Sequence, residues 1–263
     1  MASRTKQKEE ARARRLAEER AAAERARRDR RLRMVGGVVV LAIAIVAVAI
    51  AVSSGGGGGA SGLQKGATSS KTVASVSSLL NGIPQSGATL GSPNAPVTMT
   101  YYGDLECPIC RDFTLNGGLS PLISHEVRAG KVKIVYRAFE TATRDPSVFK
   151  TQQVAALAAG QQNRFWNYTE LFYHEQGTEG TSYVTQAYLQ GLARQVPGMN
   201  LTQWESARNN AALAAQVASD GQAGTTAGVQ GTPTLVFTGP KGQAAIGTVA
   251  TYPQLQQAVK KVS

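Results

Sequence analysis

The sequence predicts an α/β fold for its C-terminal two thirds, with strands and helices alternating along the chain. Residues 97–102 are β-branched and aromatic, and residues 131–137 alternate with period two, so both segments read as strands. An Ala-rich helical pattern follows over about 146–221. A third strand at 234–238 precedes a short partner strand and a closing helix. This order excludes a repeat protein or a β-sandwich.

The composition indicates a folded protein with an unusual charge distribution. Of the 263 residues, 42% are hydrophobic and only 17% are charged, which is not a disordered composition. The net charge is +11, but residues 1–33 hold 13 of the 28 basic and 6 of the 17 acidic residues. The basic excess therefore belongs mostly to an N-terminal tail. We expect no nucleic-acid partner for the folded part.

An uncharged segment follows the tail. Residues 34–52 contain no charged or strongly polar side chain, and as a helix they would extend about 28 Å, enough to cross a bilayer core. The positive-inside rule places the tail in the cytoplasm and the rest of the chain outside it. A cleaved signal peptide is the alternative; the long basic region favours a retained signal anchor over residues 34–53. We therefore expect a single-pass protein of the cell membrane.

The remaining chain divides by composition. Five consecutive glycines occupy 55–59, and Gly and Ser remain frequent up to about 66. Such a segment cannot bury a core, so residues 54–90 are interpreted as a tether, with a short helical stretch at 72–80. Residues 91–263 are of single-domain size and form the globular domain.

The chain has two cysteines, Cys107 and Cys110, separated by Pro108 and Ile109. A cysteine at a helix N-terminus faces unpaired backbone N–H groups, which stabilise its thiolate and lower its pKa. The thiolate is the nucleophile of disulfide exchange, and a second cysteine one turn later can resolve the mixed disulfide. Pro108 suits the first helical turn. The intervening dipeptide tunes the redox potential.

Two other interpretations of the cysteine pair remain open at this point. A structural zinc site needs about four ligands, and His125 and His174 do not have zinc spacing relative to the pair or to each other. An inert pair of buried thiols is the second alternative. We expect neither a metal nor an organic cofactor.

Further motifs carry a resemblance to a known family. The runs 91–98, 102–110, 155–172 and 231–234 resemble the opening, the redox motif, the helical insertion and the cis-proline loop of the DsbA-like branch of the thioredoxin-fold family. The resemblance covers about residues 88–263. It implies a thioredoxin-like fold with an inserted helical domain. It also implies a cis bond between Thr232 and Pro233 that faces the cysteines and shapes the substrate groove.

One position departs from the family pattern. Related proteins often carry a buried carboxylate six residues before the first cysteine, where this chain has Tyr101. Asp104 and Glu106 lie nearer to the pair. They are either substitute proton acceptors for Cys110 or simply solvated.

The resulting hypothesis is an extracytoplasmic thiol–disulfide oxidoreductase that introduces disulfides into exported proteins. Its expected partners are cysteine-containing exported proteins, the membrane itself, and a membrane-embedded redox partner similar to those serving the family. A reductase or isomerase of the same fold is an alternative. A peptide-binding or chaperone module without redox turnover is another, and a tethered protein whose basic tail is the working end is a third.

Overall fold

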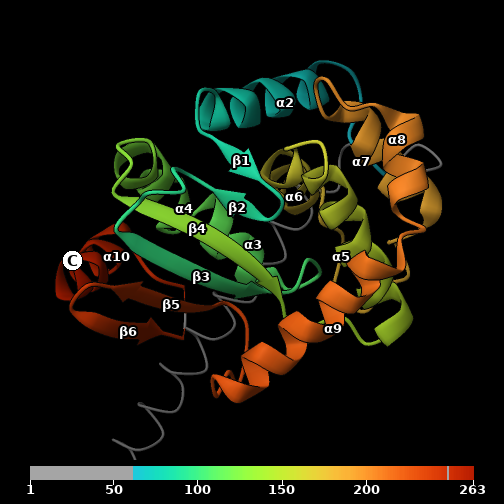
Figure 1. The fold of residues 1–263 in the computed structure, drawn as a ribbon. Helices are drawn as coiled ribbons and strands as arrows, with labels where there is room; N and C mark the ends of the chain where they lie inside the picture. The colour runs from blue at the N-terminus through green and yellow to red at the C-terminus, as the bar shows by residue number, and fades with distance from the viewer. Residues whose placement is uncertain (1–61, 248) are drawn as a thin grey trace, which may run out of the picture. The chain divides into compact units, whose positions relative to one another are not determined.

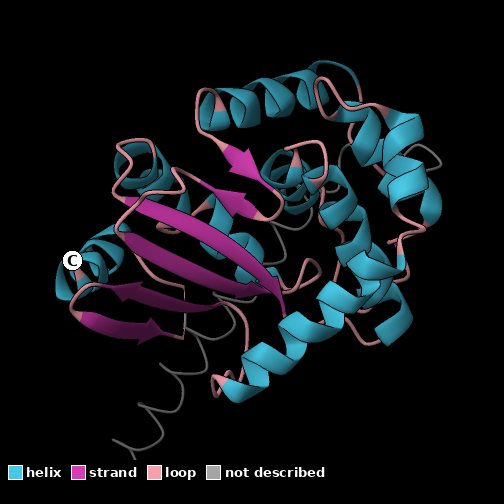
Figure 2. Ribbon diagram, viewed as in Figure 1, coloured by secondary structure: helices cyan, strands magenta, loops and turns pink. Residues whose placement is uncertain are grey.

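A six-stranded mixed sheet lies at the centre of the structure, a computed structural model that describes residues 62–247 and 249–263. These residues belong to one unit, Gly58–Ser263. Figure 2 shows the sheet flanked by helices. In spatial order its strands are β1 (Gln85–Ser86), β2 (Thr89–Leu90), β4 (Val132–Ala138), β3 (Val97–Gly103), β5 (Thr234–Gly239) and β6 (Gly242–Ile246). Only the β3–β4 pair is parallel among these strand pairs.

The two central strands follow their sequence pattern. In β4 every second residue from Val132 to Ala138 is buried, as the period-two alternation predicts. In β3 the buried positions include Met99 and both tyrosines, Tyr101 and Tyr102. β3 lies between β4 and β5 in the interior of the sheet. Both predicted strands are confirmed to within one residue.

Helices surround the sheet (Figure 1). Those near the strands are α3 (Pro108–Leu115), α4 (Leu119–Leu122), a π-helical turn η1 (Ile123–Val127) and α10 (Tyr252–Val262). The insertion consists of α5 (Pro146–Gly160), α6 (Phe165–His174), α7 (Gln186–Gln195), α8 (Leu201–Ala207) and α9 (Ala211–Thr226). These five helices gather beside the sheet, on the right of Figure 1. The α/β fold with a helical insertion is confirmed, and the insertion ends at Thr226 rather than near 221.

Short polar side chains set the starts of four helices in the insertion. Asp145, Thr185, Asn200 and Asn210 each accept a hydrogen bond from a backbone N–H of the first turn of α5, α7, α8 and α9. Each cap satisfies a donor that has no partner within its helix. The local sequence therefore specifies where these helices begin.

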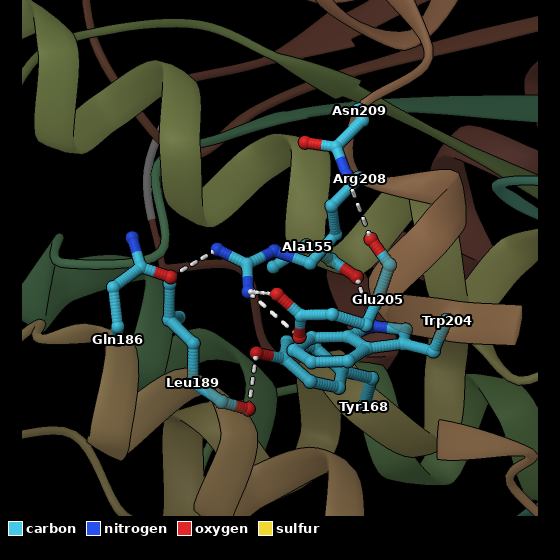
Figure 3. Close-up of polar contacts among 8 residues, drawn as sticks. All are labelled: Ala155, Tyr168, Gln186, Leu189, Trp204, Glu205, Arg208 and Asn209. Carbon is cyan, nitrogen blue, oxygen red and sulfur yellow. Dashed lines mark hydrogen bonds and ion pairs between the residues drawn. The ribbon is translucent and has the colours of Figure 1, made fainter. Parts of the chain in front are cut away.

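Trp204 of α8 links the insertion helices (Figure 3). Its indole N–H donates to the carbonyl of Ala155 in α5 at 2.9 Å. The guanidinium of Arg208 lies 4.8 Å from the centre of the indole ring and pairs with Glu205 at 3.2 Å. A cation over a partly desolvated ring contributes about 0.5–2 kcal/mol. The indole hydrogen bond therefore joins α8 to α5.

The expected tether at 54–90 is wrong for the residues that the structure describes. Residues 66–80 form α2 (Gly66–Leu80), and β1 and β2 follow as the edge of the sheet. Leu63, Val76, Leu80 and Leu90 are buried in the core. Val76 and Leu80 lie four residues apart, one helical turn, so they share one face of α2. Serine and glycine around them concealed this apolar face, and the domain begins before residue 91.

Three expected segments lie outside the described residues. They are the basic tail 1–33, the membrane span 34–53 and the beginning of the tether, 54–61. Within 62–247 and 249–263, no helix is both long enough and apolar enough to pass through a bilayer.

The packing of α2 leads to a stability prediction. Leu80→Ala should lower the free energy of unfolding by about 2–4 kcal/mol, because it opens a cavity where a fully buried side chain stood. Urea denaturation of the full chain measures the change. Ser78→Ala, on the exposed side of α2, should change it by less than about 0.5 kcal/mol. Equal, negligible effects of both substitutions would mean that α2 is not part of the cooperative domain.

Candidate active site

Cys107 lies at the N-cap of α3, immediately after β3 and a short loop. Its sulfur accepts a hydrogen bond from the backbone N–H of Cys110 at 3.2 Å. Pro108 occupies the first helical turn, where a backbone N–H would have no partner within the helix, so proline's missing N–H costs no hydrogen bond. The predicted placement of the cysteine pair is therefore confirmed. Both cysteines are free thiols and both are buried.

The two thiols have opposite electrostatic environments. The pKa of Cys107 is lowered to about 7, chiefly by a hydrogen bond from the Cys110 thiol. Burial raises this pKa. Hydrogen bonds from the Thr232 side chain and from the N–H groups of Cys110 and Ile109 lower it further. Burial raises the pKa of Cys110, and the hydrogen bond to Cys107 raises it further. Cys107 is therefore the nucleophile near neutral pH, whereas Cys110 stays protonated.

The loop before β5 closes over Cys107. The peptide bond between Thr232 and Pro233 is cis, as expected. The Cys107 sulfur donates to the carbonyl of Thr232 at 3.4 Å. β5 runs antiparallel to β3, with Thr234 opposite Tyr102. The residues just before β5 therefore meet the residues just after β3, although 125 positions separate Cys107 from Thr232.

Ile109 is the exposed member of the redox motif. It is 51% exposed, while Pro233 is buried. Among the described residues, Leu201 is the other large hydrophobic side chain that stands out in solvent. Ile109 therefore offers an apolar contact beside the reactive sulfur.

Asp104 and Glu106 are both buried, so the alternative that they are solvated is wrong. Asp104 Oδ2 accepts backbone hydrogen bonds from Thr141, Ala142 and Thr143 at 2.9–3.0 Å. Its other oxygen accepts from the Thr143 hydroxyl at 2.6 Å. Burial raises the pKa of Glu106. The role of either group as a proton acceptor stays a prediction. Asp104 also holds the backbone of residues 141–143 through its hydrogen bonds.

The position of the expected family carboxylate holds a buried tyrosine. The Tyr101 hydroxyl lies 3.5 Å from that of Thr114 in α3 and 3.4 Å from that of Tyr173 in α6. Burial raises the pKa of Tyr101. A cluster of neutral hydroxyl groups therefore lies between β3, the C-terminal end of α3 and α6.

Several residues that support the site were not predicted. Gln176, after α6, donates to the carbonyls of Leu105 at 2.7 Å and Cys107 at 3.1 Å. Thr141 contacts the hydroxyl of Thr232. These residues lie far from the cysteines in sequence and belong to no motif, so only the folded chain brings them to the site.

The site holds no arrangement for a metal ion. In the described part of the chain, no three side chains of His, Cys, Asp or Glu come together in a geometry that could bind one.

Curated relatives share parts of this sequence. Disulfide bond formation protein D of Bacillus subtilis is 24% identical over 183 residues, 65% of this chain and 75% of that protein. The Na(+)/H(+) antiporter NhaA 1 of Mycolicibacterium gilvum is 33% identical over 109 residues. That match spans 41% of this chain but only 17% of the antiporter.

Solved structures and a family model agree with the geometry. Oxidised BdbD from Bacillus subtilis superposes with a TM-score of 0.58 and 21% identity, covering 68% of this chain and 97% of that one. Chlamydia trachomatis DsbA superposes with a TM-score of 0.56 and 18% identity, covering 66% of this chain and 90% of that one. The family model described as Thioredoxin matches residues 85–261. The chain therefore belongs to the thioredoxin family, and it shares its fold with the DsbA and BdbD structures on which it superposes.

Proposed function

We propose that this chain introduces disulfides into exported proteins through Cys107 and Cys110. The observation that carries the exchange chemistry is the pair of unequal thiols: Cys107 has a pKa lowered to about 7, and the buried Cys110 has a raised pKa. The names of the disulfide bond formation proteins among the relatives support the same activity.

The exchange proceeds in two displacements. A substrate thiolate attacks Cys107 of the Cys107–Cys110 disulfide, the bond between the two cysteines breaks, and Cys110 leaves and takes up a proton. A second substrate thiolate then attacks the substrate sulfur of the mixed disulfide and releases the Cys107 thiolate. Two electrons pass from the substrate to the pair. A membrane-embedded redox partner would remove them before the next cycle.

The stability of the leaving thiolate is one of the factors that set the reduction potential of the pair. Hydrogen bonds that stabilise the Cys107 thiolate favour the reduced pair and make its disulfide more oxidising. Structural disulfides in secreted proteins have potentials below about −300 mV, so a moderately oxidising pair can donate to them. The Cys107 pKa of about 7 is close to that of thioredoxin and well above that of the most acidic cysteines of this chemistry, so we propose at most a mild oxidant.

The site of action is proposed from the sequence. The uncharged span 34–52 after a basic tail supports a retained membrane anchor with the redox domain outside the cytoplasm. An ion antiporter contains a segment similar to part of this chain, and this similarity supports a location at a membrane. Protease added to intact cells should remove the redox domain while leaving a cytoplasmic marker whole. Protection of the domain until the cells are lysed would contradict this location.

The reduction potential tests the proposed direction. The full chain in detergent, equilibrated with glutathione buffers and trapped by alkylation, should give a value of about −200 mV, between the strongly oxidising and the reducing members of the fold. A value near about −270 mV would favour the reductase alternative. The absence of any reversible dithiol–disulfide couple would favour a peptide-binding module.

The pH dependence of alkylation tests the thiol assignments. The alkylation rate of reduced enzyme should rise with pH through a midpoint of about 7, as Cys107 loses its proton. Cys107→Ser should remove this phase, because the pKa of Cys110 is raised. Cys110→Ala should move the midpoint upward, since it removes the thiol that donates to Cys107. A wild-type midpoint near the ordinary thiol value would contradict the assignment.

A further inference from the structure

The loop after β4 is fixed by a single carboxylate. Three consecutive backbone N–H groups, those of Thr141, Ala142 and Thr143, converge on one oxygen of Asp104 at 2.9–3.0 Å. The Thr143 hydroxyl donates to the other oxygen at 2.6 Å. Asp104 is fully buried and lies just after β3. The position of this loop relative to the redox motif is therefore set by Asp104.

The same loop contacts the cis-proline segment. The Thr141 hydroxyl is hydrogen-bonded to the hydroxyl of Thr232, and either oxygen can be the donor. The carbonyl of Thr232 in turn accepts from the sulfur of Cys107 at 3.4 Å. A continuous series of contacts thus runs from Asp104 through Thr141 and Thr232 to the reactive thiol.

The identity of the donor between the two threonines has a chemical consequence. The neutral Cys107 thiol can donate to the Thr232 carbonyl, but the thiolate has no proton and needs donors instead. The Thr232 side chain is one of the groups whose hydrogen bonding lowers the pKa of Cys107. A hydroxyl has only one proton to donate. That proton is free for the thiolate only if Thr141 is the donor of the pair.

We propose that Thr141, held in place by Asp104, is a positioning residue that donates to Thr232 Oγ1 and so directs the Thr232 hydroxyl proton toward the sulfur of Cys107. The proposal rests on the proposed function of the Cys107–Cys110 pair and deepens it. It gives Asp104 the task of a loop anchor. It also assigns a role to a loop that no motif in the sequence marks.

Thr141→Val tests the proposal directly. The pKa of Cys107, measured from the pH dependence of iodoacetamide alkylation of the reduced full chain, should rise by roughly 0.5–1 unit, because the Thr232 proton loses its direction while the hydroxyl itself remains. Thr141→Ser keeps the hydroxyl and should restore the wild-type value. Thr151→Val is the matched control, because its hydroxyl bonds Ser147 within α5, outside this series of contacts.

A double-substitution cycle separates this route from a general loosening of the site. Thr232→Val should raise the pKa of Cys107, and adding Thr141→Val should raise it no further, since Thr141 acts through Thr232. Asp104→Asn alone should raise the pKa of Cys107. Added to Thr141→Val, it should raise that pKa no further. The threonine variants decide the proposal even if Asp104→Asn fails to fold.

Three results would overturn the proposal. An unchanged pKa in Thr141→Val would mean that the contact is structural only, and a lower pKa would make Thr232 the donor. Additive shifts in the double variant would show that Thr141 does not act through Thr232. Each of these would leave the reversible redox couple intact. Loss of that couple in the wild type would instead refute the proposed function, so the two failures are distinguishable.

Discussion

The antiparallel pairing of β3 with β5 is the constraint on which the site depends. The redox motif follows the end of β3, and the cis-proline segment precedes the start of β5, so the register between Tyr102 and Thr234 brings the two loops together. A slip of one residue would reverse every side chain of β5. Leu235 and Phe237 are both fully buried. They fix the register because their side chains must point into the core. The geometry around Cys107 therefore rests on apolar burial one strand away.

The thiolate environment follows from this arrangement and from the start of α3. Donors reach the Cys107 sulfur from its own helix and from the opposite loop, while Cys110 is enclosed by the core. Burial alone would raise both pKa values. The difference between the two thiols arises because only Cys107 lies where hydrogen-bond donors converge, and because Cys110 donates to it. The hydrogen bond between the thiols lowers the pKa of Cys107 and raises that of Cys110.

The sequence predicted the parts of the site that are local. The cysteine pair, the proline in the first turn and the segment at Thr232–Pro233 each belong to a short motif whose chemistry can be read from a few residues. Thr141 and Gln176 could not be predicted, because their contacts depend on how the chain returns to the redox motif after β4 and α6. The beginning of the domain was misplaced because α2 buries only a narrow apolar face among serines.

The environments of the two nearby carboxylates separate their roles. Asp104 accepts from the backbone N–H groups of the 141–143 loop and so holds that loop in place. Burial raises the pKa of Glu106, so its surroundings favour the protonated carboxyl. With Tyr101 in place of the usual strand carboxylate, the proton acceptor for Cys110 stays a prediction, and Asp104 is already committed to ordering the loop. Neighbouring groups whose environments differ in this way divide structural and chemical work between them.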